Sequence, residues 1–343
     1  MMKRWSHVLW VSLTLSPGLA CHNDGLPARD AVAAADRLFL ETPTLTEFPL
    51  PATEVGPMGI TAGPDGNLWF TGQADMIGRM TLDGVVTEFP TPKANSSPGS
   101  ITAGPDGNVW FVEKVGMNIG RITPGGKITE FPLSTKGSPT DIVVGPDGNL
   151  WFTQFGGMMG RITPKGDIRI FPIGDKDSNT DNLTLAGLAL GLDGNLWFTA
   201  SSASGLSGST IGRFQTSGKH TFFPLPDTEA QPRGITPGPD GSLWFVEYLG
   251  NQIGRITTDG IVTEFPWPKG LGMPTRIVAG PDGNMWSVDG NRGRPLRTRP
   301  NGESEFFGPV FDNNNPSYGI TVGPDGNIWY TQLNRNCIVR ITL

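Results

Sequence analysis

Cysteine, histidine and tyrosine are scarce in this chain of 343 residues, which contains two, three and three of them. Two cysteines permit at most one disulfide, so a small scaffold held together by disulfides is excluded. Charged residues make up only 17% of the chain, the formal net charge is −6, and the basic residues form no stripe. Nucleic acid is therefore not an expected partner. Beyond the N-terminus, no apolar run is long enough to cross a membrane.

The first twenty residues have the composition of an export signal. Lys3 and Arg4 give a basic start, and residues 8–15 form a short apolar run, of the length expected for cleavage rather than for membrane insertion. Small residues then lead to Ala20, after which cleavage is expected. We therefore predict a signal peptide at residues 1–20 and an exported protein.

Cys21 follows the predicted cleavage site and has two alternative uses. The residues before it resemble a bacterial lipobox, in which the cysteine is acylated and becomes the mature N-terminus. In an oxidising compartment it can instead form a disulfide with Cys337, which would exclude acylation. The expected location is thus periplasmic or on the outer surface as a lipoprotein, or secreted. Residues 21–43 are expected to be a tether, with a lipid on Cys21 as the sole membrane attachment.

Glycine and proline are abundant, with 48 and 31 residues, and both recur at fixed positions of an internal repeat. Each repeat contains a G-x-D-G core, and successive cores are 41 to 47 residues apart. The cores begin at Gly63, Gly104, Gly145, Gly191, Gly238, Gly280 and Gly323. A repeat of this length with several short strands is typical of a β-propeller with one blade per repeat. We predict an all-β fold, a seven-bladed β-propeller of four-stranded antiparallel blades, over residues 44–343.

The first repeat shows how the sequence forms a blade. Four short β runs, at residues 59–63, 67–71, 77–81 and 85–89, are separated by turns in which glycine supplies a positive φ. Each repeat also contains one tryptophan, one arginine and one turn aspartate at equivalent positions. We expect these three residues to be structural, because seven equivalent copies cannot all serve one site.

The two ends of the repeat region complement each other. The last repeat stops at Leu343, before its fourth β run. The first repeat is preceded by residues 45–49, whose sequence L-T-E-F-P matches the fourth run of other repeats. We therefore predict that an N-terminal strand completes the last blade, which leaves no exposed sheet edge.

Two positions of the repeat vary strongly, although the rest is nearly constant. One lies five residues before the core glycine, where the first strand begins, and the other lies three residues after the repeated tryptophan, where the second strand ends. The first set is Met58, Gly99, Thr140, Ala186, Arg233, Thr275 and Tyr318. The second set is Gly72, Glu113, Gln154, Ala200, Glu247, Asp289 and Gln332. Both sets should surround the mouth of the central channel, where we predict a ligand pocket.

Repeats five to seven contribute the richest set of side chains to this mouth. The candidate catalytic residues are Tyr318, Glu247 and Asp289, and the candidate binding residues are Arg233, Tyr248, Arg276, Gln332, Glu113 and Gln154. Glu247 and Asp289 would offer oxygen ligands to a hard divalent cation such as Mg²⁺. The alternative is that Arg233 or Arg276 pairs with these carboxylates in salt bridges at the rim. The expected ligand is a small molecule or a peptide, and the expected state is a monomer.

The repeat G-I-T-x-G-P-D-G-N-L-W-F-T, followed by I-G-R-I-T and I-T-E-F, resembles the virginiamycin B lyase family. The copies at residues 99–131 and 234–265 show it best, and the resemblance covers residues 45–343. It implies a seven-bladed propeller that opens the ester-closed ring of type B streptogramins by a Mg²⁺-assisted elimination. In such a reaction a base removes an α-proton while the metal polarises the ester carbonyl.

The chain departs from this family at the catalytic histidines. The family has histidine at the start of first strands, as P-H-x-I, in two late blades, where this chain offers Arg233, Thr275 and Tyr318. Its own histidines are His7, His22 and His220, all away from the expected mouth. Glu113 and Glu247 match the glutamates of the family's W-F-x-E motif, and Asp289 can replace a third carboxylate.

Two classes of function therefore remain. One is an enzyme, either a carbon–oxygen lyase that opens an ester or lactone ring or a hydrolase, which uses Glu247, Asp289 or Tyr318 in place of imidazole. The other is a propeller that binds a ligand or a protein at its mouth without turnover. Arginine and threonine are poor general bases, which weakens the case for an enzyme. Dependence on Mg²⁺ would distinguish the two classes, because a lyase of this kind needs the metal for activity and a binding propeller does not.

Overall fold

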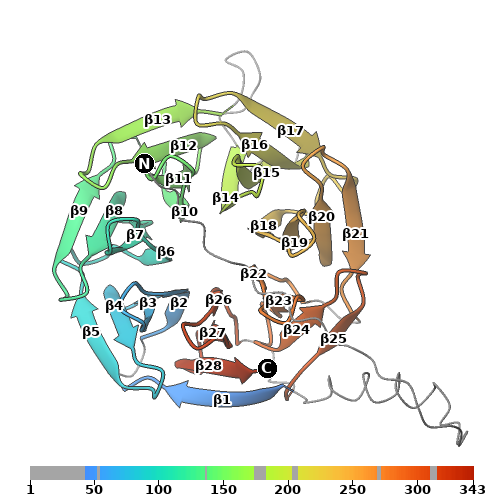
Figure 1. Ribbon diagram of the computed structural model, residues 1–343. Helices are drawn as coiled ribbons and strands as arrows, with labels where there is room; N and C mark the ends of the chain where they lie inside the picture. The colour runs from blue at the N-terminus through green and yellow to red at the C-terminus, as the bar shows by residue number, and fades with distance from the viewer. Residues whose placement is uncertain are drawn as a thin grey trace, which may run out of the picture. The chain divides into compact units, whose positions relative to one another are not determined.

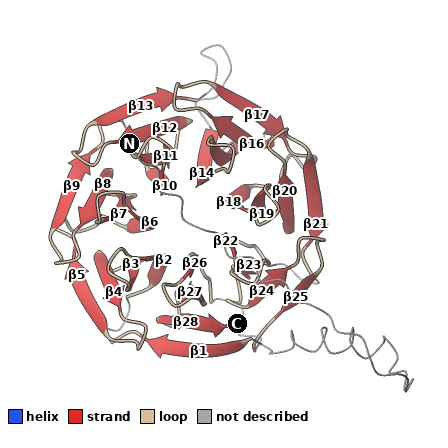
Figure 2. Ribbon diagram, viewed as in Figure 1, coloured by secondary structure: helices blue, strands red, loops and turns tan. Residues whose placement is uncertain are grey.

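The computed structural model describes residues 43–51, 55–135, 137–173, 183–202, 208–268, 272–309 and 315–343. The predicted signal peptide, Cys21 and the predicted tether up to residue 42 lie outside the described residues. Pro43–Leu343 forms a compact unit of seven four-stranded antiparallel sheets arranged in a ring (Figure 1). The predicted seven-bladed β-propeller is confirmed. Every element of these ranges is a strand (Figure 2), and no helix among them is long and apolar enough to cross a membrane.

We number the blades in chain order, from the innermost strand outwards. Blades 1 and 2 contain β2 (Pro57–Ala62), β3 (Leu68–Gly72), β4 (Met76–Met80), β5 (Val86–Pro90), and β6 (Pro98–Ala103), β7 (Val109–Glu113), β8 (Asn118–Ile122), β9 (Ile128–Pro132). Blades 3 and 4 contain β10 (Pro139–Val144), β11 (Leu150–Gln154), β12 (Met158–Ile162), β13 (Ile168–Pro172), and β14 (Leu183–Leu190), β15 (Leu196–Ser202), β16 (Ser209–Phe214), β17 (His220–Pro224). Blades 5 and 6 contain β18 (Pro232–Pro237), β19 (Leu243–Glu247), β20 (Gln252–Ile256), β21 (Val262–Pro266), and β22 (Ile277–Ala279), β23 (Met285–Val288), β24 (Pro295–Thr298), β25 (Ser304–Phe306). Blade 7 contains β26 (Ile320–Val322), β27 (Ile328–Gln332), β28 (Cys337–Thr342) and β1 (Thr44–Pro49).

The ring is closed by the N-terminal strand, as predicted. β1 pairs antiparallel with β28 in a register from Thr44 opposite Thr342 to Pro49 opposite Cys337. Blade 7 therefore has the order β1-β28-β27-β26, with the first strand of the domain outermost (Figure 1). Strands from the two ends of this unit therefore share one sheet, and their main-chain hydrogen bonds close the ring.

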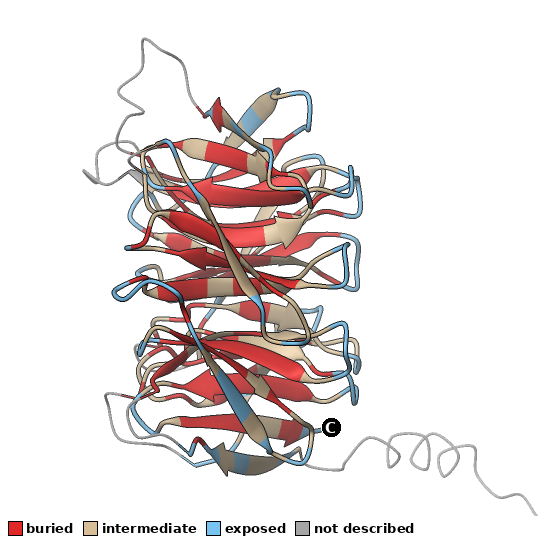
Figure 3. Cartoon of the chain, turned by 90° about the vertical axis from the view of Figure 1, so that its left-hand side faces the viewer, coloured by how far each residue is buried: buried red, intermediate tan, exposed pale blue. Residues whose placement is uncertain are grey.

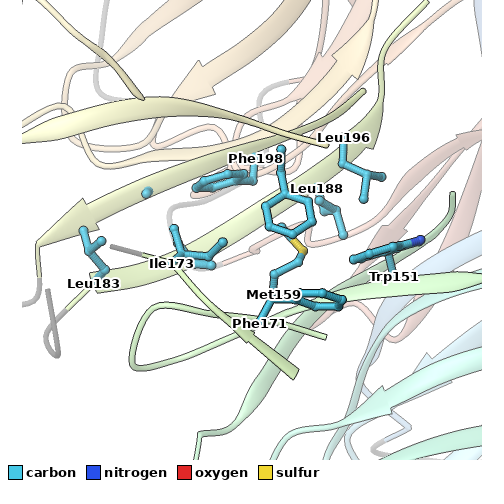
Figure 4. Packing of buried hydrophobic residues seen from close by; sticks show 11 residues of the cluster. Trp151, Met159, Phe171, Ile173, Leu183, Leu188, Leu196 and Phe198 are labelled. Atoms are coloured by element: carbon cyan, nitrogen blue, oxygen red, sulfur yellow. The ribbon is translucent and has the colours of Figure 1, made fainter. Parts of the chain in front are cut away.

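The second strand of each blade lies deepest between its neighbours. Every residue of β3 is buried, whereas the outermost strand β5 has no buried residue. Figure 3 shows this gradient, with buried residues along the inner strands and exposed residues at the turns. The packing between blades is apolar: one cluster joins Met159 and Phe171 of blade 3 to Leu188 and Phe198 of blade 4 (Figure 4). Burial between blades is therefore what holds neighbouring sheets together.

The repeated tryptophan and turn aspartate form the same hydrogen bond in every blade. In blade 1 the indole N–H of Trp69 donates to Asp65 at 2.9 Å, beside Gly66, whose φ is 76°. The equivalent pairs are Trp110–Asp106, Trp151–Asp147, Trp197–Asp193, Trp244–Asp240, Trp286–Asp282 and Trp329–Asp325. Burial opposes ionisation of Asp65, but hydrogen bonds from Trp69 and Asn67 outweigh it and lower the pKa of that carboxyl. The structural role predicted for these residues is confirmed.

The repeated arginine ties three of the blades to the blade that follows. The guanidinium of Arg79 lies 5.8 Å from the ring centres of both Trp69 and Phe89 and donates to the carbonyl of Pro124 in blade 2 at 2.9 Å. Equivalent bonds run from Arg121 to Pro164 and from Arg213 to Thr258. The arginine thus satisfies a neighbouring carbonyl, which confirms the prediction that it is structural.

Candidate functional site

A cavity of about 670 Å³ opens where the seven first strands converge. Its walls come from the first strands of all seven blades and from residues just before β22 and β26, together with a few residues that follow second strands. The volume lies within the range typical of small-molecule sites. The lining is largely isoleucine, valine, threonine and glycine, so the few charged side chains define its chemistry.

A bulge in the first strand lets two successive residues reach this cavity. In blade 5, Pro232 pairs with Glu247 and Ile235 pairs with Phe245, so the ladder contains one extra residue on β18. Arg233 and Gly234 lie within that bulge, and both line the cavity. Similar shifts in register occur in β2, β6, β10 and β14. A regular strand would turn alternate residues away from the axis, whereas a bulge re-aims them.

Among the described residues, Asp141 is the only carboxylate that lines the cavity, and it connects four blades. It follows the start of β10 in blade 3 and is 2% exposed. One oxygen accepts from the guanidinium of Arg276 in blade 6 at 2.5 Å and from the backbone N–H of Leu188 in blade 4 at 2.9 Å. The other accepts from its neighbour Ile142 and from the hydroxyl of Ser100 in blade 2. The Asp141–Arg276 ion pair thus crosses the channel between nearly opposite blades.

Two further cations line the cavity without a carboxylate partner. Lys114 follows β7, and its chain packs on Gly99, where a Cβ atom would come within 2.5 Å of the lysine Cε. Its ammonium makes no hydrogen bond or salt bridge to any described residue. Burial, with repulsion from Arg276 and Arg233, lowers the pKa of Lys114, and attraction to Asp141 only partly offsets this.

Arg233 is held by an aromatic ring instead of an acid. Its guanidinium carbon lies 3.7 Å from the ring centre of Tyr248, which follows β19 in the same blade. Burial lowers the pKa of Arg233, although Tyr248 and Tyr318 oppose this shift. Within the described part of the chain, the guanidinium forms no salt bridge. With Lys114, Arg276 and Asp141, the cavity carries three cations and one anion, in a chain whose net charge is −6.

The structure brings together some of the residues predicted from the sequence. Arg233, Arg276 and Tyr318 line the cavity, and Tyr248 supports Arg233. Glu113, Gln154, Glu247 and Gln332 end their second strands, are fully buried inside their blades, and do not line the cavity. The alternative of rim salt bridges also differs from the structure, because Arg276 pairs with Asp141 and not with Glu247 or Asp289.

The buried amides and Asp289 have structural partners. Gln154 donates to the carbonyl of Gly137 at 2.7 Å, and Gln332 donates to the carbonyl of Gly293 at 3.2 Å. The thiol of Cys337 donates to Gln332, so this cysteine is a buried free thiol, while its proposed partner Cys21 lies outside the described residues. Asp289 accepts the backbone N–H groups of Asn291 and Arg292 in a turn after β23.

The two W-F-V-E glutamates lie in equivalent places but have different partners. Glu113 accepts from the side-chain amide of Asn118 at 2.7 Å, and burial raises its pKa to about 7. Neither oxygen of Glu247 accepts a hydrogen bond from a described residue. Burial, and then the nearby Glu264 carboxylate, raise the pKa of Glu247 to about 8.

The residues predicted to hold Mg²⁺ do not fit that ion. Asp289 is committed to its own turn, Glu247 lies inside blade 5, and neither lines the cavity. Within the described ranges, no three His, Cys, Asp or Glu side chains form a group that could hold a metal. The expectation of Mg²⁺ at Glu247 and Asp289 thus gains no support from the geometry and stays a prediction.

The sequence analysis missed several cavity residues, among them Ser100, Asp141 and Lys114. A signal for the first two was present in the sequence, four residues before the core glycine of each repeat. Four blades have glycine there, and the other three have Ser100, Asp141 and Arg276, which are the residues bonded across the channel. No imidazole lines the cavity in the described ranges, since His220 begins the outermost strand β17 and His7 and His22 lie outside them.

Comparisons with known proteins agree on the family. The sequence profile of the virginiamycin B lyase family matches residues 36–186 and 178–343. A streptogramin B lyase structure is 33% identical, with a TM-score of 0.78, over 88% of this chain and 98% of that chain. Virginiamycin B lyase from Staphylococcus aureus is 36% identical with the same TM-score, over 88% of this chain and 99% of that chain. A catalytically inactive histidine-to-alanine form of that enzyme, solved with quinupristin, matches equally well. No curated protein sequence matches this chain. The chain belongs to the virginiamycin B lyase family.

Proposed function

We propose that this protein binds a small molecule in the central cavity and does not carry out a magnesium-assisted elimination. The observation that carries the proposal is the identity of the residue at the start of β18. Arg233 occupies the place where the P-H-x-I motif has histidine, and it lines the cavity. An arginine stays protonated and cannot accept a proton at neutral pH. Asp141, the one carboxylate that the described residues place in the cavity, already accepts four hydrogen bonds.

Quinupristin tests this proposal directly, because a relative was solved with it. The full chain is incubated with quinupristin, with Mg²⁺ or with EDTA, and the product is separated by chromatography and fragmented. Ring opening by elimination leaves the mass unchanged, whereas hydrolysis adds one water, so both outcomes are visible. We expect no ring-opened product. A linear product that needs Mg²⁺ would overturn the proposal.

A metal-independent elimination is the second candidate, and one observation favours it. Lys114 is a cavity amine without a hydrogen-bond partner among the described residues, and burial shifts its pKa downward, the direction that a lysine general base requires. Tyr318 lines the same cavity, and its hydroxyl forms no hydrogen bond with a described residue. Ring opening that persists in EDTA, is lost in Lys114→Met and survives in Lys127→Met would support this candidate. Lys127 is an exposed lysine in a turn of the same blade.

We also propose that the chain is exported, with Cys21 acylated. The support is the sequence alone: a basic start, a short apolar run and small residues before Cys21. Intact mass of the protein purified from a bacterial membrane fraction tests it. A lipid-sized mass increase that disappears in Cys21→Ala is expected, and an unmodified N-terminus after Ala20 would contradict acylation but not export.

A further inference from the structure

We infer that the ligand of the central cavity carries an anionic group, a carboxylate or a phosphate, that binds between Lys114 and Arg233. This inference rests on the proposed function of the cavity as a ligand site, and it adds the chemical class of the ligand. Four charged side chains line the cavity: Lys114, Arg233, Arg276 and Asp141. The cavity therefore has an excess of positive charge inside an acidic protein.

The charges of the cavity are not balanced by the protein. Asp141 accepts hydrogen bonds from Arg276 and from three other donors. The described residues therefore offer no free carboxylate in the cavity to Lys114 or Arg233. Placing cations in a partly buried space without counter-charges is unfavourable, and cations of like sign repel each other there. A bound anion would remove both costs. Binding of an anion should therefore lower the electrostatic free energy of the site.

Arg233 is positioned to recognise a planar or tetrahedral anion. The stacked ring of Tyr248, 3.7 Å from the guanidinium carbon, fixes the plane of the side chain. No described acceptor takes hydrogen bonds from this guanidinium, so its N–H groups are available to a ligand. A guanidinium binds carboxylates and phosphates through two parallel hydrogen bonds, whereas a lysine adds a mobile point charge. Lys114 supplies that second charge from blade 2.

The rest of the lining favours an organic body attached to the anion. Ile60, Ile101, Ile142 and Ile277 come from four different blades, and Tyr318 adds an aromatic ring. A volume of about 670 Å³ is far larger than one inorganic ion needs. The structure therefore points to a small organic acid or an organic phosphate, with its charged end at Lys114 and Arg233 and its apolar part against the first strands.

Matched probes test this inference on the full chain. Benzoate and phenyl phosphate carry the two anionic groups on the same ring, and benzamide is the neutral counterpart of benzoate. Binding is measured by isothermal titration calorimetry at fixed ionic strength, because screening weakens exposed charge interactions. The variants are Arg233→Gln and Lys114→Gln. Their controls are Arg169→Gln and Lys127→Gln, and Arg169 is exposed and also stacks on a ring, that of Phe171, at 4.7 Å.

The expected result is saturable binding of at least one anionic probe that is about tenfold or more weaker in each cavity variant, with the control variants unchanged. The dissociation constant of benzamide should be at least about tenfold higher than that of benzoate. Which of benzoate and phenyl phosphate binds more tightly distinguishes a carboxylic acid from a phosphate.

Two different failures can be told apart. Binding of quinupristin or benzamide that is indifferent to Arg233→Gln and Lys114→Gln would overturn the anionic ligand while leaving the cavity as a ligand site. Absence of any heat of binding, from the anions, benzamide and quinupristin alike, would overturn both. Thermal unfolding of each variant, measured in parallel, shows whether a lost signal reflects a lost fold.

Discussion

Asp141 and Glu247 are both carboxyl groups removed from solvent, at 2% and 0% exposure, yet the ring surrounds them very differently. Asp141 lies at the axis and accepts hydrogen bonds from a guanidinium, a hydroxyl and two backbone N–H groups. Glu247 lies inside blade 5, accepts none from a described residue, and has the Glu264 carboxylate nearby. With its pKa raised to about 8, Glu247 is mostly protonated at neutral pH.

The difference shows that the place of a buried carboxyl group in the ring decides which hydrogen-bond donors it meets. Inside a blade, burial favours the neutral acid, and a protonated Glu247 can donate its O–H to Glu264. At the axis, donors from several blades converge and can hold a charge. The cations repeat this contrast, because Arg276 has Asp141 whereas Lys114 and Arg233 have no such partner.

The largest expected effect is on Asp141. Asp141→Ala leaves Ser100, Arg276 and the N–H of Leu188 without their acceptor, so we expect the free energy of unfolding to fall by about 3–5 kcal/mol. Urea unfolding of the variant measures this loss. Asp141→Asn is the milder variant, since it keeps an acceptor but removes the charge.

A double-mutant cycle shows how much of that loss belongs to the ion pair across the channel. If Arg276→Met in the Asp141→Ala background restores part of the stability, on the order of 1 kcal/mol or more, an unpaired, partly buried cation was the main penalty. Strict additivity of the two substitutions would contradict the cross-channel coupling.

The second effect concerns Glu247. Its folded pKa is about 8, above the ordinary value of 4.5, so the folded state retains a proton that the unfolded chain releases between these values. Stability should therefore fall as the pH rises from about 4.5 to about 8 and then level off. Glu247→Gln removes this dependence and should gain about 1–3 kcal/mol relative to the wild type at pH 8, with no gain near pH 4.

Glu113→Gln is the matched control, in the same W-F-V-E context of blade 2. The pKa of Glu113 is raised to about 7, and Asn118 donates to it, so the gain should be smaller and complete by about pH 7. Unfolding by urea between pH 4 and pH 9 compares both variants. Equal gains in the two blades would show that the partner amide makes no difference.

Most of the fold could be predicted from the repeats because each blade carries the same sequence motif. The Gly turn, the tryptophan and the turn aspartate recur seven times, so architecture and blade number could be inferred from their spacing. Closure by residues 45–49 could be inferred because their sequence matches the fourth run of other repeats. Variation at the start of the first strand located Arg233 and Tyr318 for the same reason, since departures from a repeat are visible within one chain.

The orientation of individual side chains could not be inferred in this way. Glu247 and Gln332 lie at the correct face of the ring, but their side chains turn into the blade, which strand alternation alone did not decide. The bulge in β10 brings Thr140 and Asp141 both to the cavity, and a regular strand would have shown only one of them. Lys114 was missed because it follows the strand rather than ending it.

The smallest expected effect is on Lys114, and it has the opposite sign to that on Asp141. Burial and two neighbouring arginines lower its pKa below the ordinary 10.5, so the charged form is disfavoured in the folded state. At neutral pH Lys114→Met should therefore raise the free energy of unfolding by about 0.5–1 kcal/mol. As the pH rises through the folded pKa towards 10.5, the wild type loses this charge and regains stability, so the difference should shrink. Lys127→Met, on the exposed turn of the same blade, should change nothing, and a loss of stability in Lys114→Met would mean that its ammonium is paired in solution.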